Sequence, residues 1–165
     1  MATDSRSGTG DPQIRGPAES VAFLLSKLGS EAGSRFATRL EPLGLEPRQV
    51  GILRMVAASG GESQLELSSR LGIQPSRMVT LLDDLERRRY VERRVNPEDR
   101  RARSLHLTTA GRKLLAKVAT IGLEHERETC AALSGEQRAQ LLALLRLMAD
   151  VPGNPIDVHP GLRHS

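Results

Sequence analysis

The sequence has little of three features that commonly carry chemistry or membrane contact. It holds a single cysteine, no tryptophan, and only two phenylalanines and one tyrosine. One cysteine cannot form an intrachain disulfide or a cysteine-based zinc or iron–sulfur site. Apolar runs such as residues 21–25 are far shorter than the roughly 20 residues of a membrane-spanning helix. Residues 1–17 also lack the apolar core of a secretory signal, so we expect a soluble, cytoplasmic protein with no membrane contact.

Motifs of catalysis and metal binding are also missing from the sequence. It shows no nucleophile–base motif, no phosphate-binding glycine-rich loop and no dinucleotide fingerprint. The four histidines are scattered: His106, His125, His159 and His164. We therefore expect no enzyme, no cofactor and no metal site. Cys130 is interpreted as a buried, inert cysteine, with a redox-sensing thiol as the alternative.

The positive charge is concentrated in one short stretch. The chain has 24 Lys and Arg residues against 20 Asp and Glu residues, a formal net charge of +4. Residues 87–103 hold eight arginines and three acids and so carry +5, which leaves −1 for the rest of the chain. A basic stretch on a nearly neutral protein indicates a polyanion-binding surface. For residues 87–89, a solvated helix end stabilised by the helix dipole is the alternative.

Apolar spacing predicts a mainly α-helical chain between two tails. Apolar residues recur every three or four positions, which is typical of helices that bury one face. Pro42 should end the first helix, while Pro47 and Pro75 should open the second and fourth. Capping boxes at residues 63–66 and 134–137 should open the third and sixth helices.

Two short segments change to an alternating pattern. Residues 91–95 and 103–107 alternate apolar and polar side chains, which indicates two β-strands. Residues 96–99 between them have turn chemistry, so the pair predicts a hairpin with a long basic tip. Thr108 or Thr109 should then cap the long fifth helix, which we expect to extend to about residue 133.

Two short helices joined by a tight turn and followed by a hairpin predict a winged helix-turn-helix. Four side chains of its fourth helix should face inward: Met78, Val79, Leu82 and Leu85. The outward side chains Ser76, Arg77 and Thr80 would meet base edges in the DNA major groove, which is about 12 Å wide and admits one helix. The hairpin tip would reach the adjacent minor groove, and the remaining arginines would bind phosphates.

Four segments of the sequence resemble one family. They are Pro-Ser-Arg-Met-Val-Thr-Leu-Leu-Asp-Asp-Leu-Glu (75–86), Val-Glu-Arg-Arg (91–94), Asn-Pro-Glu-Asp-Arg-Arg-Ala-Arg (96–103) and Leu-Thr-Thr-Ala-Gly (107–111). Together they resemble the MarR family of bacterial transcriptional regulators, and the flanking long helices extend the resemblance over about residues 18–150.

The resemblance implies a homodimer that binds double-stranded DNA at a pseudo-palindromic site and controls transcription. Control is usually repression, often relieved by a small aromatic or phenolic ligand. The DNA contacts that it implies are Ser76, Arg77 and Thr80 on the recognition helix, and Asp99, Arg101, Arg103 and Arg94 in the wing. Phe36 and Met55 are candidate ligand-binding residues, with a role as plain core residues as the alternative.

The same reading gives an expected organisation for the whole chain. It runs from a disordered tail (1–17) through an N-terminal dimerisation helix (18–45), the winged helix-turn-helix (46–110) and C-terminal dimerisation helices (111–150) to a C-terminal arm (151–165). The long apolar stripes of the terminal helices favour dimerisation, because one small winged domain cannot cover them.

Three questions stay open at this point. Arg89 stands where the family commonly has glycine, so it either adopts a left-handed conformation or lets the helix end differently. Asp83 and Asp84 are interpreted as surface charges, with pairing to wing arginines as the alternative. The second functional hypothesis is a winged-helix protein-interaction module without specific DNA binding, which the polar recognition face disfavours.

Overall fold

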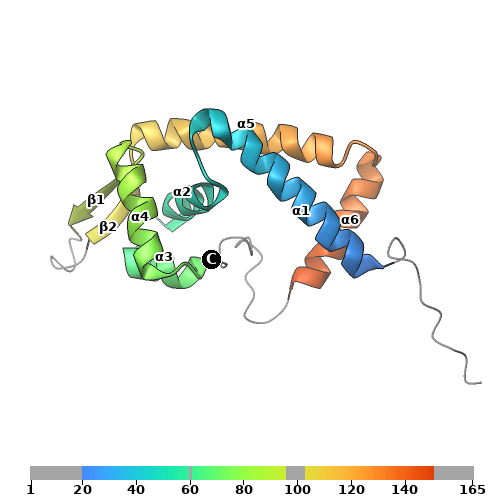
Figure 1. The fold of residues 1–165 in the computed structure, drawn as a ribbon, viewed down its shortest axis with the longest axis horizontal. Coiled ribbons are helices and arrows are strands. Elements are labelled where there is room, and N and C mark those ends of the chain that lie inside the picture. Colours follow the sequence, from blue (N-terminus) through green and yellow to red (C-terminus); the bar gives the residue numbers. More distant parts are fainter. Residues whose placement is uncertain (1–19, 60, 96–102, 151–165) are drawn as a thin grey trace, which may run out of the picture. The chain divides into compact units, whose positions relative to one another are not determined.

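The structure is a computed structural model that describes residues 20–59, 61–95 and 103–150. In the described residues, the elements follow the order α1 (Val21–Leu40), η2 (Glu41–Leu43), α2 (Pro47–Ser59), α3 (Gln64–Leu71), α4 (Pro75–Arg87), β1 (Val91–Val95), β2 (Arg103–Leu107), α5 (Thr109–Thr129) and α6 (Gly135–Ala149) (Figure 1). A mainly α-helical chain with one small hairpin is thereby confirmed. The predicted tails and the wing residues Asp99 and Arg101 lie outside the described residues.

The chain divides into two compact units between Ser34 and Arg35. The first unit contains residues 21–34 of α1, which leave several large apolar side chains exposed: Val21, Phe23, Leu24, Leu25 and Leu28. The second unit holds the remaining elements. In neither unit do the described residues include a helix with the length and apolar character to span a bilayer.

Local capping chemistry fixes where most helices begin. The hydroxyl of Ser63 accepts from the backbone N–H of Glu66, whose carboxylate accepts in return from the Ser63 N–H, which completes the predicted capping box. The backbone hydrogen bond from Ser63 also lowers the pKa of Glu66. Ser134 caps α6 in the same way, and Thr108 caps α5. Helix α5 ends at Thr129, four residues before the predicted end.

Three backbone positions take a left-handed conformation where helices end. Gly44 and Gly72 have φ of 61° and 62°, and Gly72 makes the tight turn between α3 and α4. Arg89 has φ of 59°, so this arginine adopts the conformation that the family commonly gives to glycine. The α4 end is thus turned toward β1 without a glycine.

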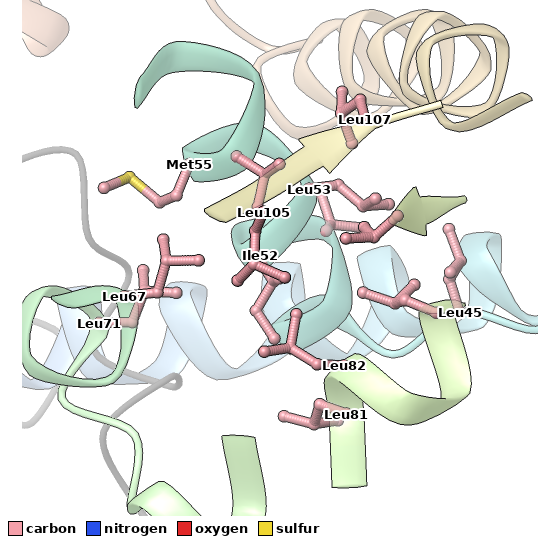
Figure 2. Close-up of a cluster of buried hydrophobic side chains, with 14 of the residues drawn as sticks. Leu45, Ile52, Leu53, Met55, Leu67, Leu71, Leu81, Leu82, Leu105 and Leu107 are labelled. Atoms are coloured by element: carbon pink, nitrogen blue, oxygen red, sulfur yellow. The ribbon is translucent and has the colours of Figure 1, made fainter. Parts of the chain in front are cut away.

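The core of the second unit lies among α2, α3, α4, the hairpin and the first half of α5. Figure 2 shows side chains from α2, α3, α4 and β2 meeting in one cluster, with Ile52, Leu53 and Leu82 among them. Sequence patterning was wrong at one position of α4: Val79 is 40% exposed, and Leu81 is buried in its place. The reason is geometric, since the buried stripe of α4 is narrow and Val79 lies just beyond its edge.

The hairpin is antiparallel, with Val91 opposite Leu107 and Val95 opposite Arg103. A short bridge pairs Ser63 with Ser104, so the segment before α3 adds a third strand-like edge to β2. In Figure 1 the hairpin lies beside α4 and next to the first turns of α5. This packing fixes the position of the hairpin relative to α4.

Helix α6 has no buried residue within the single chain. Its exposed apolar side chains are Leu141, Leu142, Leu144, Leu147 and Met148. Monomers commonly expose single, scattered apolar residues, whereas α6 exposes five large ones within eight positions.

Candidate nucleic-acid interface

Helix α4 presents a polar face on the side opposite its buried residues. Ser76, Arg77 and Thr80 are all exposed, as the sequence predicted. The Arg77 side chain is 45% exposed and its Nη2 lies 3.3 Å from Oε2 of Glu46, which precedes α2. The Thr80 hydroxyl donates to the Ser76 carbonyl at 3.3 Å, so its proton is used within the helix. This face is a candidate surface for base edges.

A buried amide joins α4 to the start of α2. Gln49 is only 4% exposed, and its Oε1 accepts from the Glu46 backbone N–H at 3.0 Å while its Nε2 donates to Asp84 Oδ2 at 2.8 Å. Burial raises the pKa of Asp84, but the hydrogen bond from Gln49 and the guanidinium groups of Arg87 and Arg88 outweigh it and lower that pKa. The recognition helix is therefore attached to α2 through an ionised carboxylate.

Arg88 is partly buried, and its guanidinium binds groups of the protein. Its two Nη atoms donate to the carbonyls of Gly44 and Leu43, each at 2.6 Å. Its guanidinium also lies 5.0 Å from the ring centroid of Tyr90, within the range of a cation–π contact. Arg88 thus connects the end of α4 to the turn before α2.

Arg93 anchors the hairpin to α4. Its Nη2 lies 2.8 Å from Asp83 Oδ1, and its Nη1 donates to the Glu86 carboxylate. A longer contact of 3.4 Å reaches Gln64 Oε1 on α3. The alternative of pairing with a wing arginine holds for Asp83, which pairs with Arg93. Asp84 instead pairs with Gln49 and with Arg87 and Arg88 at the end of its own helix.

These contacts reduce the basic surface that the charge count indicated. Arg88 and Arg93 were counted among the phosphate-binding arginines, but both donate to groups of the protein. Four arginines of the described stretch keep exposed side chains: Arg87, Arg89, Arg94 and Arg103. Arg94 pairs with Glu92 on its own strand through Nε at 2.9 Å. The roles of Arg94 and Arg103 as contacts to the DNA backbone stay predictions, as do the wing contacts of Asp99 and Arg101.

The two candidate ligand residues lie in different environments. Met55 is a buried core residue of α2 (Figure 2), and its exposed fraction is 6%. Phe36 is partly buried against the core, and its ring lies 5.4 Å from that of His125 on α5. Their participation in a ligand pocket stays a prediction.

Other reactive groups are dispersed in the part of the chain that the structure describes. Cys130 is half-buried at the end of α5 rather than fully buried as predicted. Within residues 20–59, 61–95 and 103–150, no three His, Cys, Asp or Glu side chains gather in a way that could hold a metal ion.

Sequence reasoning missed Glu46 and Gln49, and it held the pairing of Asp83 with a wing arginine, now seen to be Arg93, only as the alternative. A signal for Arg93 was present, because strand alternation puts it on the same side as Val91, which is buried. No comparable signal marks Gln49, because its partner Asp84 lies 35 residues away along the chain.

The winged region matches a known family. The model of the MarR family matches residues 43–102, which include α2, α3, α4 and β1. The transcriptional regulator HosA of Escherichia coli O111:H- is 31% identical over 100 residues, which are 61% of this chain and 74% of that protein.

Solved structures with the same fold include complexes with DNA. The transcriptional repressor CouR, bound to a 23-mer DNA duplex, matches with a TM-score of 0.70 and 31% identity over 80% of this chain and 94% of that chain. The MarR family protein Rv2887 of Mycobacterium tuberculosis, in complex with DNA, has a TM-score of 0.70 and 25% identity, over 79% of this chain and 98% of that chain.

Proposed function

The chain belongs to the MarR family, and on that basis we propose that it is a homodimeric, sequence-specific DNA-binding transcriptional regulator. We further propose that it acts as a repressor and that a small aromatic or phenolic ligand releases it from DNA. CouR and Rv2887, which share its fold and are 31% and 25% identical to it over the matched residues, are themselves bound to DNA in their structures.

The observation that carries this proposal is the exposed face of α4. Ser76 and Arg77 are polar, are exposed and lie in the first turn of a helix whose opposite side is locked into the core. Arginine can bind guanine through two hydrogen bonds in the major groove. Because the hairpin is anchored to the same helix by Arg93, recognition helix and wing would approach DNA together.

Dimerisation is supported by α6, which has no buried residue in the single chain. Covering its apolar side chains with a second copy would remove them from water, at about 25 cal/mol per Å² of apolar surface. A twofold dimer would set two α4 helices on half-sites about one helical turn apart, 10–10.5 bp. Binding to chromosomal DNA would place the protein in the cytoplasm, and we propose no catalytic activity.

The test begins with selection of a duplex from a randomised library by the full-length protein. We expect a selected duplex with two related half-sites, bound much more tightly than random DNA of the same length. Affinity should fall steeply with salt, because each phosphate that is neutralised releases counterions. Failure to select any sequence above random DNA would overturn the proposal in favour of a protein-interaction module.

Two variants separate base reading by α4 from contact of the wing with the minor groove. Arg77→Ala should reduce discrimination between selected and random duplex by about 1–3 kcal/mol. Arg101→Ala should weaken binding while the dimer stays folded, which sedimentation and circular dichroism can verify.

Mobility-shift titrations with and without simple phenols test whether a ligand releases the protein from DNA. An unchanged affinity across a panel of such compounds would contradict this class of ligand.

A further inference from the structure

Helix α4 exposes an apolar side chain at one flank of its polar face. Val79 is 40% exposed, while Met78, directly before it in the sequence, is fully buried. It follows Ser76 by three residues and precedes Asp83 by four, and such spacings put side chains on one stripe of a helix. Val79 therefore lies among the side chains that would enter a DNA groove.

Thr80 adds a second methyl group to this region. Its hydroxyl donates to the Ser76 carbonyl at 3.3 Å. A threonine whose hydroxyl bonds to its own helix has its χ1 angle fixed, and its proton is not available to a base edge. The exposed Thr80 side chain can then contact a base through its methyl group.

Arg77 and Val79 lie on opposite flanks of the exposed face. They are two residues apart, which corresponds to about 200° around an α-helix. Arg77 lies toward Glu46 at the start of α2. Val79 shares its flank with Asp83 and Glu86, which hold Arg93 of the hairpin. The two side chains would thus face different base pairs, with Val79 on the side of the wing.

We propose that Val79, supported by the Thr80 methyl group, reads the 5-methyl group of a thymine in each half-site. Among the four bases of DNA, thymine alone presents a methyl group in the major groove, and apolar side chains recognise it by contact. This inference rests on the proposed function as a DNA-binding regulator. It assigns the half-site a thymine on the wing side of the base pair that Arg77 reads.

Deoxyuridine substitution tests the contact without altering the protein. Each thymine of the duplex selected by the full-length protein is replaced by deoxyuridine, symmetrically in both half-sites, and affinity is measured by mobility shift. One replacement should weaken binding by about fourfold per half-site, the value expected for burial of one methyl-sized group. Val79→Ala should bind the selected duplex more weakly and should respond less to that replacement, because only its own β-carbon and the Thr80 methyl group remain near the thymine.

A matched control comes from Leu65 on α3, which is 72% exposed. Leu65→Ala removes an exposed apolar side chain outside α4 and should respond to deoxyuridine as the wild type does. Val79→Thr, which keeps one methyl group, provides a second variant if the alanine variant does not fold.

The possible outcomes separate this inference from the proposed function. If the protein selects a duplex but no thymine replacement weakens binding, the inference is overturned and the function stands. The same holds if Val79→Ala responds to deoxyuridine as strongly as the wild type. If no duplex is selected, the proposed function fails and the inference fails with it.

Discussion

The guanidinium of Arg77 on the recognition helix lies 3.3 Å from the carboxylate of Glu46, which precedes α2. The side chains are 45% and 57% exposed, so the pair contributes little to folding. Its position is more informative than its strength, because it sets a negative charge beside the arginine that we propose reads a base. If Arg77 reads a base as we propose, Glu46 would compete with DNA for its guanidinium.

Glu46→Gln should strengthen binding to both selected and random DNA, because it removes a charge that repels phosphate and releases Arg77. The free energy of unfolding should change by less than about 0.5 kcal/mol. Titrations of a double-mutant cycle with Arg77→Ala provide the check. If Glu46→Gln tightens binding equally with and without Arg77, the carboxylate acts through general repulsion rather than through this pair.

Arg93→Ala should destabilise the fold by about 1 kcal/mol, because the partly exposed carboxylates of Asp83 and Glu86 lose the cation that they share. DNA affinity should fall further than stability alone explains, since two uncompensated carboxylates would then face the phosphates. Urea denaturation and mobility shifts measure the two effects. Arg94→Ala is the control, because Arg94 is largely exposed and pairs within its own strand, so stability should stay within about 0.5 kcal/mol.

Asp84→Asn should destabilise the protein at neutral pH by about 1 kcal/mol, through loss of the charge that Arg87 and Arg88 stabilise. The folded-state pKa of Asp84 is lowered, so its contribution is present above the unfolded value of about 3.9 and is lost as pH falls through the folded pKa. Unfolding curves of wild type and variant should therefore converge below about pH 4. A difference that persists at pH 2 would show that the charge of Asp84 is not the cause.

Arg89→Gly should stabilise the fold by about 0.5–1 kcal/mol, because glycine adopts a φ of 59° without strain. Thermal unfolding measures the gain. Arg89→Ala, which removes the charge and keeps the strained backbone, is the control and should give no such gain. Equal effects of Arg89→Gly and Arg89→Ala would contradict the assignment of strain to residue 89.

At Gly111 glycine is required by lack of space rather than by backbone conformation. A Cβ there would lie 2.0 Å from the Tyr90 carbonyl oxygen, so Gly111→Ala should cost at least about 2 kcal/mol.

Local patterns in the sequence were sufficient for the order of elements. Proline at the first helical turn, the Ser63 capping box and the alternation in residues 91–95 each act within a few residues of the chain. Backbone N–H groups at a helix start need a nearby acceptor, and a side chain close in sequence supplies it wherever the rest of the protein lies. These elements follow the prediction for that reason.

Patterns at the edge of a helix face were less reliable. Val79 fits an apolar spacing as well as Leu81 does, and only the position of α4 against its neighbours decides which of them is buried. The difference matters, because it places an apolar side chain on the face that we assign to DNA.

The sequence by itself determined the helices, the hairpin, their caps and the concentration of arginine in residues 87–103. Only the tertiary structure decided which arginines remain available for a polyanion. Arg88 donates to carbonyls of the turn before α2, and Arg93 pairs with acids of α4. A net charge is a sum over the chain, whereas the availability of each cation depends on which acceptors the fold brings within hydrogen-bond distance.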